Sequence, residues 1–366
     1  MSQRFRAAGF ASVLLPLLVS TAGAADTDLD AKAVALNKKL LNLDAHTDVL
    51  IASTPERYWG PNHSSRTGLE KLRAGGVDAV AFAIAVGPGP RTPEGVAEAR
   101  KEANEKLATI HTFVKESGGR AEIALTAADI ERLHRQGKVA VIETFLNARS
   151  LGRDVNGIDE FYKAGVRVFG LTHAGNNDFA DSSRPQQGEG EEHHGLSPLG
   201  KEAVARLNAL GALIDVSQLT PAGVFQVLSL TKAPVIATHS DVRALVDNTR
   251  NLSDEELDAI KKNGGVVSAV PFSAYLAKAQ PATLEDYVSH IDYLVKRIGV
   301  DHVGIGSDFN HGSGVAGFED ESDAPHVTRE LLRRGYTEEQ IAKIWGGNFL
   351  RVFREAEAVS KKRAGS

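Results

Sequence analysis

The sequence predicts a (β/α)8 barrel, a closed cylinder of eight parallel strands surrounded by helices. Short apolar runs alternate with helical stretches along the chain after its first 25 residues, as in folds built from repeated βα units. Polar side chains that can bind a metal close several of these runs, namely His46 with Asp48, Glu143, His173, His239 and Asp308. Because the carboxyl ends of the strands in such a barrel form one face, these residues predict a single site there.

The eight strands are expected where runs rich in Val, Ile, Leu and Phe carry few charges, as strands covered on both faces require. They span residues 41–48, 77–86, 138–144, 166–172, 212–217, 234–239, 265–270 and 302–307. A ninth and shorter run at 121–125 is a further candidate. An open doubly wound sheet is the structural alternative, but the glycine-rich phosphate loop typical of its first strand does not follow Leu43.

Start and stop signals mark the helices between these strands. Thr126 stands where a helix N-cap is expected, and Ser197 caps a helix whose first residue is proline. Ser253 and Thr337 each begin a sequence that fits a capping box. Gly211 is expected to end the helix over 198–210.

Length and composition fit one large globular domain. The chain has 366 residues, of which 42% are hydrophobic and 24% charged. Since no linker, low-complexity tract or repeat interrupts it, residues 26–366 are expected to form a single barrel domain with extra C-terminal helices. The net charge of -5 and the lack of a basic stripe argue against nucleic acid as a partner.

The first 25 residues have the pattern of a cleavable signal peptide. Arg4 and Arg6 precede an apolar run over 7–20, and the small residues at 22–24 resemble a cleavage site. The run is too short to span a bilayer comfortably, and the polar C-terminal tail lacks the apolar end of a lipid-anchor signal. We therefore expect a periplasmic or secreted protein with no membrane anchor in its mature form.

Metal binding is expected from histidine and carboxylate side chains, because the chain contains no cysteine. His46 and Asp48 alternate on one strand and so point the same way, although a surface turn could also explain this pair. Imidazole and carboxylate together suit zinc or a similar divalent ion. Glu143 could bridge two such ions, or instead cap a helix or pair with an arginine. His239 is the clearest ligand for a second ion, with a buried structural histidine as the alternative.

Three residues have chemistry that suits a substrate. Asp308 could take a proton from a nucleophilic water and pass it to a leaving amine, with a helix N-cap as the alternative. Arg250 suits bidentate capture of a substrate carboxylate, with a surface salt bridge as the alternative. His173 could bind a metal, polarise a substrate carbonyl or stabilise a tetrahedral oxyanion.

These residues and their surroundings resemble the membrane (renal-type) dipeptidases, a family of metal-dependent barrel hydrolases. The matching segments cover nearly the whole chain after residue 25 in the family's order: 44–48, 170–177, 194–200, 207–217, 233–240, 250–251, 303–309 and 345–349. The resemblance implies a homodimeric zinc dipeptidase that acts on small dipeptides, often with a D-residue at the C-terminal position.

The resemblance also implies a role for each candidate residue. His46, Asp48 and Glu143 would hold the first zinc ion, Glu143 would bridge to the second, and His239 would belong to the second. His173 would contact the substrate near the scissile carbonyl. Arg250 would bind the terminal carboxylate, and Asp308 would carry the proton.

One position departs clearly from the family pattern. The family has a histidine ligand of the second metal after Asp-x-Ser at the end of the fifth strand, where this chain has Gln218. An amide oxygen is a poorer zinc ligand than imidazole, so the second site is expected to be weak, altered or empty. His193, His194 and His311 are loop residues that could replace the histidine, and the spacing selects none of them. The segment after Glu143 also lacks the glycines often found there.

The sequence leaves three functions to compare. The first is a metal-dependent dipeptidase of the membrane dipeptidase type, which needs only one well-held metal to activate water. The second is a non-hydrolytic, tautomerase-like tailoring enzyme that uses a single metal because Gln218 replaces a ligand. The third, a non-catalytic binding protein, has no chemical need for this whole set of polar residues.

Overall fold

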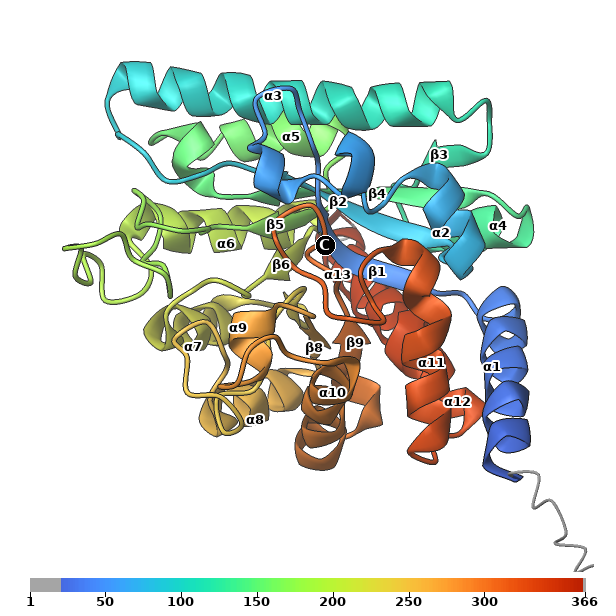
Figure 1. The fold of residues 1–366 in the computed structure, drawn as a ribbon. Helices are drawn as coiled ribbons and strands as arrows, with labels where there is room; N and C mark the ends of the chain where they lie inside the picture. The colour runs from blue at the N-terminus through green and yellow to red at the C-terminus, as the bar shows by residue number, and fades with distance from the viewer. Residues whose placement is uncertain (1–20, 365–366) are drawn as a thin grey trace, which may run out of the picture.

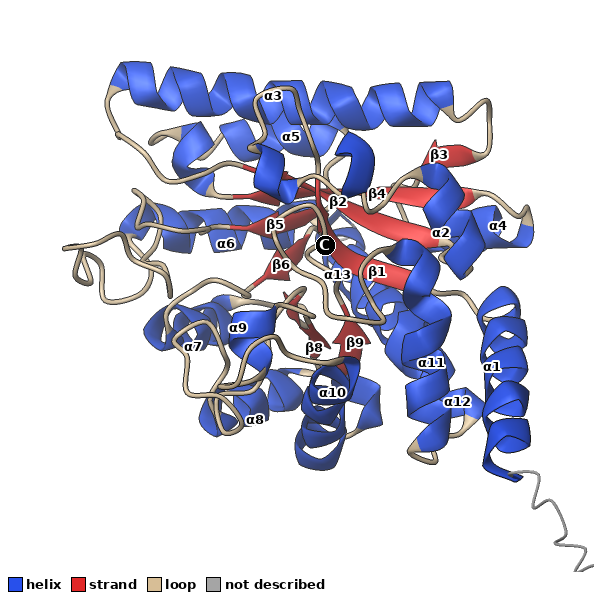
Figure 2. Cartoon of the chain, viewed as in Figure 1, coloured by secondary structure: helices blue, strands red, loops and turns tan. Residues whose placement is uncertain are grey.

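The predicted barrel is confirmed by the computed structural model, which describes residues 21–364 of the chain. In this part of the chain, parallel strands follow one another in the order β1-β2-β4-β5-β6-β7-β8-β9, and β3 pairs with β4 outside that path. Helices surround the strands (Figure 2). A bridge between Thr47 and Phe309 closes the cylinder, and the Asp308 N–H donates to the His46 carbonyl at 2.8 Å across the same seam.

The strands agree closely with the predicted runs. All begin and end inside the predicted ranges except β4, which continues two residues further, and the ninth run forms β3. Their bounds are β1 (Leu43–Asp48), β2 (Ala79–Ala85), β3 (Ala121–Ile123), β4 (Val139–Leu146), β5 (Val168–Gly170), β6 (Leu213–Asp215), β7 (Ile236–Ala237), β8 (Val266–Ala269) and β9 (Val303–Ile305).

The expected helix signals are confirmed. Thr126 and Ser197 accept hydrogen bonds from backbone N–H groups of the helices they precede, Ser253 and Thr337 form capping boxes, and Gly211 ends its helix at φ 73°. The helices are α1 (Thr21–Lys39), α2 (Leu69–Gly75), α3 (Pro93–Glu116), α4 (Ala127–Arg135), α5 (Gly157–Ala164), α6 (Pro198–Leu210), α7 (Pro221–Leu230), α8 (Asp254–Asn263), α9 (Ser273–Leu276), α10 (Leu284–Ile298), α11 (Ala324–Arg333), α12 (Glu338–Ala342) and α13 (Asn348–Ala364).

The C-terminal helix α13 closes one end of the barrel. Phe349 and Phe353 of this helix belong to one buried cluster with the first inward-facing residues of the strands, and the helix contacts β6, β8 and β9, which carry residues such as Leu213 and Val266. In Figure 1, α13 lies behind the barrel, whereas the loops that follow β1 and β9 cross in front of its centre. The end that these loops surround, where the strands finish, is therefore left for a functional site.

The N-terminal prediction lies mostly beyond what the structure covers. The segment expected to be a signal peptide is residues 1–25, of which 1–20 lie outside the described residues. The small residues at 22–24, which resemble a cleavage site, lie in the first turn of α1. Among the described helices, none combines the length and apolar character needed to cross a bilayer.

Candidate metal centre

Three of the predicted polar residues meet where the first and last strands close the barrel. A register shift in β1 between Asp44 and Thr47 marks a bulge, and both His46 and Asp48 turn toward the end of the barrel. Asp308 reaches the same point from the segment after β9. Its carboxylate Oδ1 lies 3.8 Å from His46 Nε2, and Asp48 Oδ1 lies 3.8 Å from the same nitrogen.

These three side chains fit a divalent cation. Their ligand atoms all lie within 4.8 Å of one another, and the residues are buried. Within the described residues, His46 Nε2 and Asp48 Oδ1 are buried with no hydrogen-bond partner, which costs free energy unless a cation satisfies them. One imidazole and two carboxylates are a donor set that zinc accepts.

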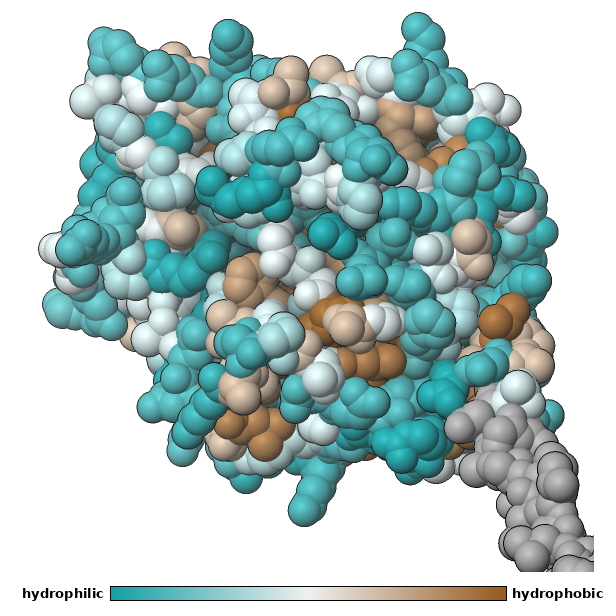
Figure 3. Space-filling model, viewed as in Figure 1, coloured by the Kyte–Doolittle hydropathy of each residue, from teal (hydrophilic) through white to brown (hydrophobic). Residues whose placement is uncertain are grey.

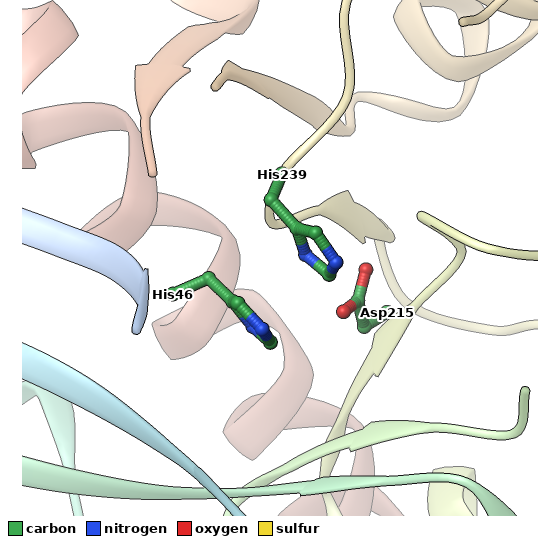
Figure 4. Close-up of side chains that lie close together, drawn as sticks. All are labelled: His46, Asp215 and His239. Atoms are coloured by element: carbon green, nitrogen blue, oxygen red, sulfur yellow. The ribbon is translucent and has the colours of Figure 1, made fainter. Parts of the chain in front are cut away.

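A second group of possible ligands, His46, Asp215 and His239, converges beside the first (Figure 4). The Thr238 hydroxyl already connects this group: Thr238 Oγ1 lies 2.6 Å from Asp215 Oδ2, 2.7 Å from His239 Nδ1 and 3.4 Å from His46 Nδ1. The hydroxyl donates to the carboxylate, so it accepts from the imidazoles, and both rings keep their lone pair on Nε2. The group therefore orients the imidazoles for a metal and does not itself form a second cage.

Gln218 forms a hydrogen bond with His239 Nε2, the atom through which His239 would bind a second metal. The two imidazole rings of His46 and His239 stack with centroids 3.7 Å apart, and burial lowers the pKa of His239 well below its ordinary value, so its ring is neutral. Gln218 Nε2 lies 3.1 Å from His239 Nε2, where the amide N–H donates to the ring's lone pair. A hydrogen bond thus occupies the nitrogen that would otherwise be free to bind a metal.

Glu143 lies outside this centre, which corrects the prediction that it binds and bridges metals. It pairs in register with Phe82 of β2, and both face outward toward α3. There His111 Nε2 lies 2.7 Å from Glu143 Oε1. The prediction was wrong because β4 does not end at residue 144: the strand is buried on both faces and continues to Leu146.

Leu146 is the last inward-facing residue of β4. It pairs with Ala85 of β2 and packs against Ala83 and Ala85. A Cβ atom placed on Gly170 would meet Leu146 Cδ1 at 2.6 Å and Asp215 Oδ2 at 3.6 Å, so Leu146 lies beside the polar cluster. An apolar side chain thus stands where a bridging carboxylate was expected.

His173 has a defined protonation pattern that restricts its role. Its Nδ1 lies 3.1 Å from the Val86 carbonyl oxygen, which can only accept, so Nδ1 carries the proton. Burial lowers the pKa of His173 well below its ordinary value, and the ring is neutral. The remaining lone pair, on Nε2, can accept a proton or a hydrogen bond. The one N–H of the neutral ring is used by the Val86 carbonyl and is not available to an oxyanion, contrary to one of the roles expected from sequence.

Arg250 and Asp308 lie on either side of His239 and His46. Arg250 is 2% exposed, and its guanidinium donates to Ser217 O at 2.6 Å, Ser240 Oγ at 3.0 Å and His239 O at 2.5 Å. Three of its five N–H donors are thereby used, and two remain for a ligand. Burial raises the pKa of Asp308, which favours a carboxyl group able to hold a proton.

A cavity of about 360 Å³ opens beside Asp48 and His173. Hydrophilic side chains predominate on this face of the molecule (Figure 3). His311 joins the cavity from the segment after Asp308: its Nδ1 lies 2.7 Å from Asp48 Oδ2, and its ring stacks on Tyr58 with centroids 4.8 Å apart. Burial lowers the pKa of His311, but the neighbouring Asp48 carboxylate raises it, and the pKa is raised overall. The two side chains therefore form a charged pair, in which His311 orients Asp48.

Of the three loop histidines considered as replacement ligands, the structure brings only His311 to the centre. His193 Nε2 lies 2.9 Å from the Asn177 carbonyl, and the His194 side chain is 86% exposed. Sequence reasoning missed the orienting role of Thr238 and two cavity residues, Lys106 and Arg184. Lys106 belongs to a charged helix and Arg184 to a polar loop. Their neighbours in the sequence therefore do not distinguish them from ordinary surface residues.

A parallel eight-stranded barrel with metal-capable side chains at the carboxyl ends of its strands is typical of metal-dependent barrel hydrolases. Comparison with known families gives the particular group. Residues 30–366 match the model of the membrane dipeptidase family (Peptidase family M19), and the chain belongs to that family.

Relatives of this chain include dipeptidase sequences and solved structures. It is 38% identical to Dipeptidase tcpJ of Claviceps purpurea (strain 20.1) over 67% of this chain and 58% of that protein, less than two thirds of the relative's length. The crystal structure of the probable dipeptidase PvdM from Pseudomonas aeruginosa is similar with a TM-score of 0.85 and 35% identity, over 91% of this chain and 99% of that one.

A third similar protein was solved with a ligand. The metallo peptidase from Rhodobacter sphaeroides, liganded with a phosphinate mimic of the dipeptide L-Ala-D-Ala, has a TM-score of 0.78 and 25% identity to this chain. The match covers 87% of this chain and 99% of that one.

Proposed function

We propose that this protein is a dipeptidase that works with one tightly held divalent metal ion, zinc. The observation that carries the proposal is the buried pair of His46 Nε2 and Asp48 Oδ1, which find no hydrogen-bond partner among the described residues and lie beside Asp308, in a chain of the membrane dipeptidase family. When bound there, zinc supplies the Lewis acidity that makes water nucleophilic near neutral pH.

The side chains around the ion have complementary tasks in hydrolysis. Asp308, whose pKa is raised by burial, takes the proton from the attacking water and delivers it to the leaving amine. The lone pair on His173 Nε2 accepts a hydrogen bond from a substrate N–H and so fixes the peptide beside the centre. The two remaining N–H groups of Arg250 bind the terminal carboxylate of the dipeptide.

The stereochemistry of the substrate is also part of the proposal. We propose that dipeptides with a D-residue at the C-terminal position are accepted, because the similar metallo peptidase from Rhodobacter sphaeroides is liganded with a phosphinate mimic of L-Ala-D-Ala. The test is an assay of L,L and L,D dipeptides with zinc-loaded protein. A protein that hydrolyses neither set under any divalent metal would overturn the proposed function.

A tautomerase-like tailoring enzyme remains the second candidate. The observation that favours it is a neutral His173 on the cavity wall with Asp48, at the same end of the barrel as Asp308, because a base and a carboxyl group that can hold a proton can together move a proton without breaking a peptide bond. It predicts zinc binding without hydrolysis of any dipeptide. Deuterium exchange into a carbonyl substrate without cleavage would support it.

Restoring two ligands should change the number of bound ions. Wild-type protein is expected to retain about one zinc per chain after dialysis, and the double variant Leu146→Glu with Gln218→His about two, because it adds an inward carboxylate and frees His239 Nε2. Zinc is measured by mass spectrometry, and the two single variants serve as controls. Wild-type protein that already retains two zinc ions would contradict the single-metal proposal.

Arg250 is expected to determine the preference for a free C-terminal carboxylate. Arg250→Met should raise KM for L-Ala-L-Ala about 10- to 100-fold, the range of one or two charge-assisted hydrogen bonds, with a smaller change in kcat. The matched substrate is L-Ala-L-Ala amide, which lacks the carboxylate. If the variant keeps the wild-type preference for the acid over the amide, Arg250 does not bind that group.

A further inference from the structure

The cavity beside the metal centre has two cationic side chains that the proposed reaction does not use. Lys106 reaches it from α3, and Arg184 reaches it from the loop after β5. The acids on its wall are Asp48, which faces the metal, and Glu102. Because His311 pairs with Asp48, the two cationic side chains face one remaining acid, Glu102, and the cavity carries a net positive charge.

Arg184 has most of its hydrogen-bonding capacity free. The described hydrogen bonds of its guanidinium consist of one contact, from Nη1 to Tyr275 Oη at 3.4 Å. Its Nε is buried, and no acceptor for it exists in the part of the chain that the structure describes. Arg250, by comparison, is held by three acceptors. A guanidinium with an unsatisfied Nε–H offers the planar pair of donors that a carboxylate accepts.

Arg184 also lies close to the proposed chemistry. After burial itself, its charge is the largest influence that lowers the pKa of His173. The Ser182 hydroxyl, two residues earlier, donates to the His173 carbonyl, and the Arg184 N–H donates to Ser182 Oγ at 3.0 Å. This chain of contacts fixes the start of the Arg184 side chain relative to His173.

Lys106 supplies the second positive charge from a buried position. The side chain is 8% exposed, and its ammonium donates to the Ala85 carbonyl at the end of β2. Glu102 Oε1 lies 3.3 Å from the same nitrogen and is more exposed. Burying an ammonium group is costly without a charge partner, and its partner Glu102 is the more exposed of the two, so an anionic ligand suits Lys106 better than an apolar one.

We propose that this cavity binds the N-terminal residue of the dipeptide and selects one with an acidic side chain, whose carboxylate pairs with Arg184 and Lys106. The proposal rests on the proposed dipeptidase function. Arg250 takes the terminal carboxylate and is not part of the cavity wall, so the cavity receives the residue on the amino side of the scissile bond. Glu102 is then available to the free ammonium group of that residue.

The test compares two substrates that differ only in charge, L-Glu-L-Ala and L-Gln-L-Ala. Wild-type enzyme is expected to have a kcat/KM about 10- to 100-fold higher for L-Glu-L-Ala, the contribution of one or two charge-assisted hydrogen bonds. Arg184→Met should lower the rate on L-Glu-L-Ala far more than that on L-Gln-L-Ala, and bring the ratio close to one. Arg184→Lys, which keeps the charge without the planar donors, should retain part of the preference.

The matched control is Arg153→Met, because Arg153 is an arginine whose side chain is 77% exposed and pairs with Asp178 on the surface. It should keep the wild-type ratio. A wild-type ratio of one or below, or an unchanged ratio in Arg184→Met, overturns the acidic subsite.

Failure of the subsite can be separated from failure of the dipeptidase function. If neither dipeptide is hydrolysed, calorimetric titration of the zinc-loaded protein with each of them gives the answer. Tighter binding of L-Glu-L-Ala by wild-type protein, lost in Arg184→Met, would keep the subsite and reject hydrolysis. Equal binding of both dipeptides, or binding of neither, would reject the subsite.

Discussion

Asp48→Asn is expected to abolish tight zinc binding and to lower kcat/KM about 1,000-fold or more, the rate equivalent of several kcal/mol. The substitution preserves the shape of the side chain but removes one of the negative charges of the proposed ligand set, in which Asp48 Oδ1 lies 3.8 Å from His46 Nε2. It also removes the charge pair with His311, so the orienting contact weakens at the same time. Zinc content per chain and competition with a chelator measure the binding, and thermal unfolding checks that the variant is folded.

Glu143→Gln is the matched control for this experiment. The family resemblance assigns Glu143 to the same ion as Asp48, whereas the structure places it outside the barrel against His111. The Glu143→Gln protein should keep its zinc and most of its activity. Only its thermal stability is expected to change, because the substitution weakens the contact with His111. A folded Glu143→Gln protein that loses zinc as completely as Asp48→Asn would mean that His46, Asp48 and Asp308 do not form the centre by themselves.

The fold could be read from the sequence because its signals are local and repeated. Each barrel strand is a short run of apolar residues, and each helix start or stop depends on one or two residues such as Ser253 or Gly211. The right-handed βα alternation then leaves few ways to arrange the strands. The barrel and its order were therefore predictable without long-range information.

The sequence could not show whether Glu143 points into the barrel or out of it, because the barrel strands are buried on both faces. A strand buried on both faces has no apolar-polar alternation, so the sequence does not tell which residues of Val139–Leu146 point inward. Glu143 and Leu146 are three positions apart, an odd number, and so they face opposite sides. Because the predicted strand ended at residue 144, two residues before the observed end of β4, the outward-facing Glu143 was selected as a ligand.

The cavity residues were unpredictable for a different reason. His311 and Arg184 lie in connecting segments whose paths depend on tertiary packing, and Lys106 lies on a helix among other charged residues. Their sequence neighbours are ordinary. His46, Asp48 and Asp308 could be found because they follow recognisable strands, and the structure brings these three together.

Asp308→Asn is expected to lower kcat about 100- to 10,000-fold, the range for loss of a general acid–base group, while KM changes little. The asparagine would keep the shape of the side chain and the backbone contact from residue 308 to the His46 carbonyl, but it could not take up or release the proton. The structure gives Asp308 a second possible role, because its Oδ1 lies as close to His46 Nε2 as Asp48 Oδ1 does.

Zinc content distinguishes the two roles of Asp308. A variant that retains zinc and loses turnover identifies a proton carrier, because a ligand could not be removed without weakening the ion's binding. A variant that loses both zinc and turnover would make Asp308 a third ligand, like Asp48. In that case the neutral His173, on the cavity wall with Asp48, is left as the candidate base. Asp258→Asn, at an exposed position of α8 paired with Arg297, is the matched control and should leave both measurements unchanged. Wild-type kcat in Asp308→Asn would remove Asp308 from the reaction altogether.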